Sequence, residues 1–104
     1  MDAQLKKGLT DICVLAALKD GESYGYKIVT ALLPYFEISE STLYPVLRRL
    51  ENKNEVTSRT EEHAGRLRRY YSLTQRGLDR LEEFSNTAKI LQTITEFIQS
   101  GGKK

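Results

Sequence analysis

The sequence predicts a mainly α-helical protein with a small β-hairpin, arranged as a winged helix-turn-helix that is followed by a long C-terminal dimerisation helix. Three observations lead to this prediction. Short stretches with helical spacing of apolar residues fill the first half of the chain, a segment rich in β-formers follows them, and a long amphipathic stretch comes last. Helix, turn and helix before a hairpin is the element order of winged helix-turn-helix domains.

The length of 104 residues fits one compact unit. We expect residues 1–73 to form the winged-helix part, and residues 74–104 to form the dimerisation helix with a frayed tail. The longest apolar run, residues 12–18, is far shorter than the roughly 20 residues that cross a bilayer. No basic-then-apolar leader opens the chain, so we expect a cytoplasmic protein without membrane contact.

The first helix is expected from about Gln4 to Lys19, and Asp20-Gly21 ends it. Its second half is apolar nearly all round, which predicts a central helix that is contacted from several sides. Cys13 lies in this apolar half. We interpret it as a buried inert thiol rather than a redox sensor.

A second helix is expected from about Tyr24 to Leu33, opened by Glu22-Ser23 and stopped by Pro34. Its buried stripe is predicted to consist of Tyr24, Ile28, Ala31 and Leu32.

The third helix lies within residues 39–54, and Pro45 suggests that it begins late, at about Ser41. Either Ser39 or Ser41 can cap it, and Asn54 tolerates the left-handed conformation of a helix exit. Its core-facing stripe is predicted to be Leu43, Val46, Leu47 and Leu50. The opposite stripe is Ser41, Pro45, Arg48 and Asn52, a polar surface suited to DNA.

The wing is predicted from two β-rich segments, residues 55–60 and 67–73, with residues 61–66 as the hairpin tip around Gly65. Basic residues concentrate in and just after the third helix. Residues 41–80 hold nine Lys/Arg and five Asp/Glu, which gives +4, whereas the whole chain carries +2. This distribution favours a polyanionic partner modestly, because charge runs are usually solvated faces.

The last helix is expected from about Gln75 to Gln99, capped by Thr74, with Gly101-Gly102-Lys103-Lys104 as the frayed tail. It carries apolar residues on two faces, and one helix standing off a small domain cannot bury both against its own core. We therefore predict a homodimer. The predicted dimerisation residues are Leu5, Leu9, Leu81, Phe84, Ala88, Leu91, Ile94, Thr95, Phe97 and Ile98.

Residues for catalysis or metal binding are scarce. His63 is the only histidine and Cys13 the only cysteine, so they assemble neither a zinc site nor a nucleophile–base pair. The acidic pairs Glu61-Glu62 and Glu82-Glu83 are interpreted as solvated, and no glycine-rich phosphate loop occurs. We expect no enzyme, no metal and no cofactor.

Three segments resemble the PadR family of winged-helix transcriptional regulators. They are residues 24–28 (Tyr-Gly-Tyr-Lys-Ile), residues 41–51 with their Leu-Tyr-Pro, and residues 69–77 with Tyr-Tyr-Ser-Leu-Thr-Gln-Arg-Gly. The resemblance implies a homodimeric repressor whose third helices enter adjacent major grooves and whose wings touch the backbone or minor groove. The single last helix is similar to the short PadR subfamily.

Two departures from the family pattern matter. Asn54 stands where the family often has glycine. The chain has no tryptophan, so the tryptophan-lined drug pocket of one branch is not expected. By analogy with the family, a small-molecule inducer would bind where first and last helices meet across the dimer. The residues at that place are Leu5, Leu9, Phe84, Ala88 and Leu91.

The candidate DNA-binding residues each have a structural alternative. Ser41 or Thr42 can simply cap the helix, Tyr44 can pack on Pro45, and arginines can solvate a surface. Arg48 lies nearer the outward stripe than Arg49, and strand alternation places Arg66 and Arg68 on one face with Arg69 on the other. The full set is Tyr24, Lys27, Ser41, Thr42, Tyr44, Arg48, Arg49, Arg66, Arg68 and Arg69.

Two functions remain open from the sequence. The first is a sequence-specific regulator, a dimeric repressor on a roughly palindromic operator of double-stranded DNA. The second is a winged-helix adaptor that binds an acidic protein and never touches DNA.

Overall fold

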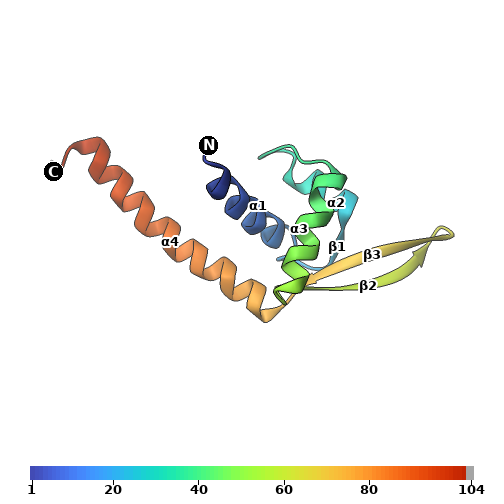
Figure 1. Ribbon diagram of the computed structural model, residues 1–104. Helices are drawn as coiled ribbons and strands as arrows, with labels where there is room; N and C mark the ends of the chain where they lie inside the picture. The colour runs from blue at the N-terminus through green and yellow to red at the C-terminus, as the bar shows by residue number, and fades with distance from the viewer. Residues whose placement is uncertain (103–104) are drawn as a thin grey trace.

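The structure, a computed structural model, describes residues 1–102, which form four α-helices and one three-stranded antiparallel sheet (Figure 1). This arrangement confirms the predicted winged helix-turn-helix with a long C-terminal helix. Along the chain the elements are α1 (Ala3–Ala17), β1 (Ser23–Tyr24), α2 (Gly25–Leu32), α3 (Glu40–Asn52), β2 (Val56–His63), β3 (Arg66–Leu73) and α4 (Gln75–Ser100).

The molecule is elongated, with principal extents of 63 × 27 × 22 Å. Helices α1, α2 and α3 form the centre, while the β2–β3 wing and α4 project from it in opposite directions (Figure 1). None of the four helices in residues 1–102 combines the length and apolar character needed to cross a membrane.

The apolar core lies between α1, α2 and α3 and closes on the base of the sheet. α3 contributes the predicted stripe of Leu43, Val46, Leu47 and Leu50, all buried. α1 contributes Val14 and Leu15, and its C-cap Leu18 is also buried, in agreement with its predicted central place. The remaining core residues are Ile28, Leu32, Ile38, Val56 and Tyr71. Each buried aliphatic side chain stabilises the fold by about 1.5–3 kcal/mol relative to exposure.

The start of α2 differs from the prediction. Ser23 and Tyr24 form strand β1, opposite Tyr71 and Tyr70 of β3, and α2 begins only at Gly25. The sheet order is therefore β1-β3-β2. The cause is a partner far along the chain, since β3 supplies the hydrogen bonds that hold Tyr24 extended. Ala31, expected in the buried stripe of α2, is exposed.

The wing is longer than predicted. β2 and β3 remain paired out to His63 and Arg66, and the turn consists only of Ala64 and Gly65, both with positive φ (52° and 78°). Two residues with positive φ make the tight hairpin turn whose twist matches the strands. The expected tip at residues 61–66 was wrong because an exposed wing lacks the apolar alternation that marks a strand.

Several helix ends agree with the prediction. Thr74 caps α4 by accepting a hydrogen bond from the Gly77 N–H at 3.1 Å, and Asn54 adopts a left-handed conformation with φ 62°. α4 runs one residue further than expected, to Ser100, and Gly101 ends it in the left-handed conformation. Lys103 and Lys104 of the expected frayed tail lie outside the described residues.

Candidate nucleic-acid interface

The N-terminus of α3 presents two hydroxyl groups to solvent. Ser39 is the cap, because its Oγ accepts a hydrogen bond from the Thr42 N–H at 3.2 Å, and α3 starts at Glu40 rather than at Ser41. The Ser39 Oγ also lies 3.0 Å from the hydroxyls of Ser41 and Thr42. Ser41 and Thr42 are both exposed. Since neither is needed as the cap, both hydroxyls remain available to a partner.

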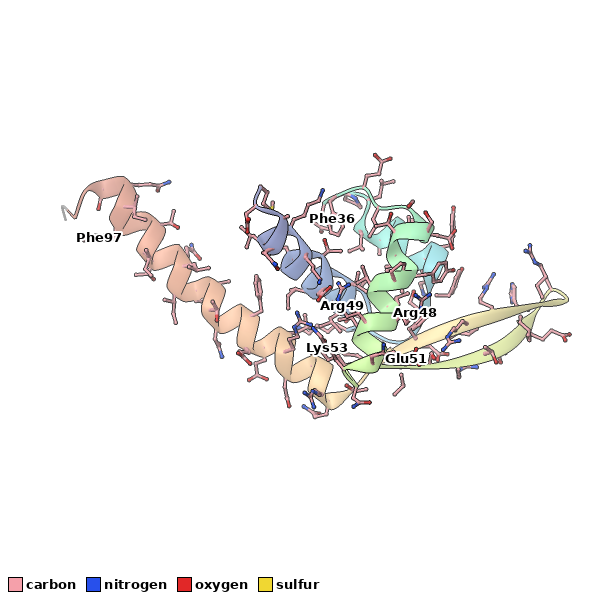
Figure 2. All side chains as sticks on the ribbon, viewed as in Figure 1. Phe36, Arg48, Arg49, Glu51, Lys53 and Phe97 are labelled. Carbon is pink, nitrogen blue, oxygen red and sulfur yellow. The ribbon has the colours of Figure 1, made fainter. Side chains whose placement is uncertain are left out.

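Arg48 and Arg49 leave α3 in different directions (Figure 2). Arg48 is exposed, whereas the Arg49 guanidinium forms an ion pair with Asp11 of α1, a residue that is only 3% exposed. Within residues 1–102 the Arg49 Nε is buried and has no hydrogen-bond partner. Arg49 was predicted as a DNA contact, but the structure turns it inward, and we leave it out of the interface.

Tyr44 lies against the start of α2. Its hydroxyl donates to the Glu40 Oε1 at 3.1 Å, and a Cβ added to Gly25 would stand only 2.5 Å from the Tyr44 Oη. Burial and the hydrogen bond to Glu40 raise the pKa of Tyr44 above its usual range. The residue is still 39% exposed. Tyr44 is therefore a fixed aromatic group at the edge of the α3 surface.

Two arginines flank a pair of tyrosine rings on one face of the wing, in the order Arg68, Tyr24, Tyr70 and Arg59. The Arg68 guanidinium lies over the Tyr24 ring at 4.0 Å, and Tyr24 meets Tyr70 edge-on with ring centroids 5.7 Å apart. Arg59 lies 4.8 Å over Tyr70 and also donates to Glu22, whose pKa this hydrogen bond lowers. Stacking of this kind contributes about 0.5–1 kcal/mol at an exposed site. It holds Arg68 on the α2 side of the wing.

Arg69 faces the opposite way, as strand alternation predicts. It donates to the Ser58 Oγ at 3.2 Å and to the Glu51 Oε1 of α3 at 3.3 Å, while Ser58 donates to the other Glu51 oxygen at 2.6 Å. Arg69 thus connects the wing to α3. Its side chain remains 53% exposed, which leaves donors for a phosphate.

Half of the predicted DNA-binding residues meet at one groove. It has a volume of about 470 Å³ and lies between β3 and the beginnings of α2 and α3. Tyr24, Tyr44, Arg66, Arg68 and Arg69 line it. Ser41, Thr42 and Arg48 lie outside it on the exposed face of α3, and Lys27 is exposed on α2.

The sequence alone did not single out two other groove residues, Tyr26 and Leu67, which are 65% and 78% exposed. Tyr26 lies within the Tyr-Gly-Tyr-Lys segment, and its place beside Tyr24 was the available signal. Leu67 shares a strand face with Arg69, and two-residue periodicity was its signal. His63 also lines this groove. Among the described residues, no three His, Cys, Asp or Glu side chains are grouped so as to hold a metal ion.

The outer half of α4 carries apolar side chains that nothing in the monomer covers. The exposed residues include Leu91, Ile94, Phe97 and Ile98, and Figure 2 shows Phe97 at the far end of the helix. The inner predicted seam residues Leu81, Phe84 and Ala88 are only partly exposed. Leu5 on α1 is 55% exposed.

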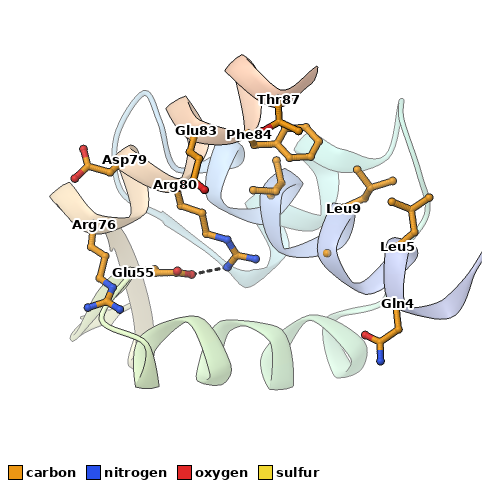
Figure 3. A pocket seen from close by; sticks show the side chains of 12 residues that line it. Gln4, Leu5, Leu9, Glu55, Arg76, Asp79, Arg80, Glu83, Phe84 and Thr87 are labelled. Carbon is orange, nitrogen blue, oxygen red and sulfur yellow. Dashed lines mark hydrogen bonds and ion pairs between the residues drawn. The ribbon is translucent and has the colours of Figure 1, made fainter. Parts of the chain in front are cut away.

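A second cavity lies between α1 and α4. Its volume is about 600 Å³, and it has an apolar side formed by Leu5, Leu9 and Phe84 and a charged side that includes Glu55 and Arg80 (Figure 3). Arg80 donates to Glu55 at 2.6 Å and to Asp11 at 3.3 Å. Desolvation lowers the pKa of Arg80, but the two carboxylates outweigh it and raise that pKa above its ordinary value.

Solved structures of similar shape point to one family. A PadR-like transcription factor from Bacteroides fragilis aligns with a TM-score of 0.84 and 31% identity over 92% of this chain and 95% of its own. A PadR family transcriptional regulator from Eggerthella lenta gives a TM-score of 0.80 and 30% identity over 92% and 86%. PadR from Bacillus subtilis, solved in complex with operator DNA, aligns with a TM-score of 0.69 and 25% identity. The alignment covers 73% of this chain and 46% of the Bacillus subtilis chain.

A search of curated proteins returned no match. The model of the transcriptional regulator PadR-like family matches residues 14–83, which span the core, α3, the wing and the start of α4. Members of this family are transcriptional regulators and not enzymes. With this match and the winged-helix geometry, the chain belongs to the PadR-like family of DNA-binding transcriptional regulators.

Proposed function

We propose that the protein is a homodimeric repressor that binds a roughly palindromic operator through α3 and the wing. The observation that carries the proposal is the exposed face of α3. Ser41, Thr42 and Arg48 are exposed there, and a basic wing follows α3 in the chain. Hydroxyl and guanidinium groups on a helix that fits the major groove are suited to phosphates and base edges.

Each part of the surface has a distinct role in this proposal. α3 enters the major groove, with Arg48 at a guanine edge or a phosphate and Ser41 or Thr42 at a phosphate. The wing places Arg66 and Arg68 at the minor groove or the backbone, where arginine binds well. Tyr24 and Lys27 on the α2 side contact the backbone, as the helix before the recognition helix does in related motifs. The operator complex of Bacillus subtilis PadR supports a DNA partner.

Dimerisation is supported by the uncovered apolar residues of α4. Leu91, Ile94, Phe97 and Ile98 are between 47% and 69% exposed. A soluble monomer seldom leaves such a stripe in water, and a second α4 would cover it. A two-fold dimer also presents two copies of α3 about one helical turn of DNA apart. We propose that residues 1–73 and 74–104 work as one unit in this dimer.

An inducer, where one acts, is proposed to bind in the cavity between α1 and α4. Leu5, Leu9 and Phe84 offer an apolar wall. This wall suits a small aromatic compound, whereas Arg80 is already paired with Glu55 and Asp11. Chemical-shift changes at Leu5 and Phe84 upon titration with small aromatic compounds would support the site. Changes confined to other regions would contradict it.

The direct test is an anisotropy titration of the protein with labelled duplexes from the DNA upstream of its own coding sequence, at several salt concentrations. We expect specific binding that weakens as salt rises. Arg66→Ala should weaken binding and reduce the salt slope by about one unit, because one phosphate contact is lost. Lys7→Ala on α1, exposed and outside the interface, is the charge-matched control.

Repression has its own test, since DNA binding alone does not establish it. A reporter behind the bound promoter should fall in expression when the protein is produced, and rise again with the Arg66→Ala variant. If no duplex binds at physiological salt, the adaptor function replaces this proposal. In that case the basic face of α3 should bind an acidic protein.

A further inference from the structure

One buried carboxylate joins the recognition helix to the dimerisation helix. The Asp11 side chain is 4% exposed and accepts from two arginines, Arg49 of α3 through Oδ1 and Arg80 of α4 through Oδ2. Arg49 lies 38 residues and Arg80 69 residues from Asp11 in the sequence. The orientation of one carboxylate group therefore ties the positions of α3 and α4 to each other.

Glu55, which follows α3, extends the network. The Arg80 Nη1 donates to the Glu55 Oε1 at 2.6 Å (Figure 3). With Asp11 and Arg49, two arginines and two carboxylates therefore balance in charge. Removing such groups from water has a cost, and apolar residues of similar size often give equal stability. An ion network instead fixes the relative orientation of the elements that it joins, because its hydrogen bonds form only in a narrow geometry.

The other attachments of α4 fix its position but constrain its direction less. Thr74 donates to the Asn54 carbonyl at 2.7 Å, and Gly77 packs on the Glu55 backbone, both at the N-terminal end of α4. These contacts lie at the pivot. Further along, Leu81 packs against the core, and apolar contact is non-directional. Arg80 is the residue that makes a directional contact beyond the pivot with α1.

The length of α4 amplifies any change at its base. With 26 residues it is about 39 Å long, so a rotation of about 10° moves its far end by about 7 Å. That displacement equals about two base pairs of duplex at about 3.4 Å each. In a dimer built through the far half of α4, a small rotation of α4 at Arg80 therefore changes the separation of the two α3 helices.

We infer that Asp11 is a positioning residue for operator recognition: by holding Arg49 and Arg80 on one carboxylate, it sets the separation of the two α3 helices and thereby the preferred spacing of the DNA half-sites. The inference rests on the proposed dimeric, operator-binding function. It assigns Arg49 to positioning and leaves base and phosphate contact to Arg48.

The first experiment measures geometry without DNA. Spin labels at Lys53→Cys and Gln92→Cys, in a Cys13→Ala background and diluted with unlabelled chain, report the distance between the end of α3 and the outer half of α4 by pulsed electron resonance. With Asp11 we expect a narrow distribution of the distance between the two spin labels. With Asp11→Asn we expect the mean distance to shift by about 4 Å or the distance distribution to broaden clearly. An unchanged distribution in Asp11→Asn overturns the inference.

The second experiment measures spacing selectivity. Half-sites are selected from random duplexes with the unaltered protein, and affinity is then compared as the spacer is changed one base pair at a time. We expect the penalty for a wrong spacer to fall from about tenfold to less than about threefold in Asp11→Asn. A uniform loss of affinity with the same spacing profile would mean a merely structural role and would overturn the inference.

Glu22→Gln is the matched control. It removes one carboxylate, as Asp11→Asn does, from the exposed pair with Arg59 at the base of the wing. Net charge changes equally, and the spacing profile should stay as it was. Should Asp11→Asn lose its cooperative thermal transition, Arg80→Lys replaces it, because one ammonium group cannot reach both carboxylates with the two-pronged geometry of arginine.

The two experiments separate the inference from the function on which it rests. If the unaltered protein binds no duplex, the proposed function fails, while the spin-label distances still decide whether Asp11 orients α4. If the duplexes bind and both readouts are insensitive to Asp11, the inference alone fails.

Discussion

Gly77 packs directly on the backbone carbonyl of Glu55, so closely that a Cβ at Gly77 would stand under 3.0 Å from that oxygen. The same carbonyl accepts a hydrogen bond from the Thr74 N–H at 3.1 Å, and the Thr74 hydroxyl donates to Asn54. The Leu-Thr-Gln-Arg-Gly segment is thus a junction that joins the exit of α3 to the entry of α4. Its glycine is required by contact and not by backbone conformation.

Replacing Gly77 with alanine should destabilise the protein by about 1–3 kcal/mol, because the atom that the new methyl group meets is backbone and cannot move cheaply. Urea unfolding at fixed protein concentration measures this. Gly8→Ala is the control, since Gly8 is also helical and has open space where the methyl would go. We expect Gly8→Ala to stabilise by up to about 1 kcal/mol, and equal effects at the two sites would contradict the junction.

Gly25 and Tyr44 give a second prediction, a coupling between two positions. Gly25→Ala would place a methyl group 2.5 Å from the Tyr44 Oη. It should therefore move the ring and weaken both stability and operator binding. Tyr44→Phe removes the atom that is hit first, so Gly25→Ala should cost less in that background. A double-mutant cycle by thermal unfolding measures the difference, and additive effects would show that the hydroxyl is not the obstacle.

Arg48 and Arg49 should separate binding from stability. Arg48→Ala is expected to weaken operator binding by about 1–3 kcal/mol with little effect on unfolding, since this side chain is exposed. Arg49→Ala leaves the buried Asp11 short of one donor and should destabilise the fold by about 1–3 kcal/mol. Anisotropy titrations and urea unfolding of both variants test this. If Arg49→Ala instead weakened operator binding without destabilising the fold, Arg49 would be a DNA contact.

The dimer prediction concerns the outer half of α4. Leu91→Glu puts a charge on the exposed apolar stripe and should shift the protein from dimer to monomer in sedimentation velocity. Gln92→Glu adds the same charge at the neighbouring polar position and should leave the dimer intact. Operator affinity should fall with Leu91→Glu alone, because one α3 reads a single half-site. A Leu91→Glu protein that still sediments as a dimer would place the interface elsewhere.

The titration of Tyr44 tests the contacts at the start of α3. Burial and the hydrogen bond to Glu40 raise its pKa, so the folded state keeps this proton after the unfolded chain, with a pKa of about 10, has lost it. Stability from this group is therefore present below about pH 10 and is lost as the pH rises through the folded pKa. Glu40→Gln should lower the pKa of Tyr44. The ultraviolet titration curve of a Tyr44→Phe variant is subtracted from that of the protein with Tyr44, which isolates the titration of Tyr44, and this is done with and without Glu40→Gln. The same Tyr44 pKa in both cases would contradict the role of Glu40.

Much of the fold was predictable because its signals are local. The apolar stripe of α3, the cap at Thr74 and the left-handed Asn54 depend on residues a few positions apart. For α3 the sequence left Ser39 and Ser41 as alternative caps, and the structure selects Ser39. Strand β1 was missed since its partner, β3, comes almost fifty residues later and no periodicity can show in two residues. The outer ends of the two wing strands, residues 61–63 and residue 66, were missed because all four of these residues are polar.

The candidate DNA-binding surface was likewise predictable from the sequence only in part. Sequence alone determined that a helix with hydroxyls and Arg48 on its outer face is followed by a basic wing, and that the last helix has more apolar surface than one domain can bury. Only the tertiary structure decided that Arg49 belongs to Asp11, that Tyr26 and Leu67 join the groove, and that Gly77 must approach Glu55. The reason is physical. Periodicity gives the direction in which a side chain leaves its own helix or strand, whereas the partner it meets depends on how distant segments pack.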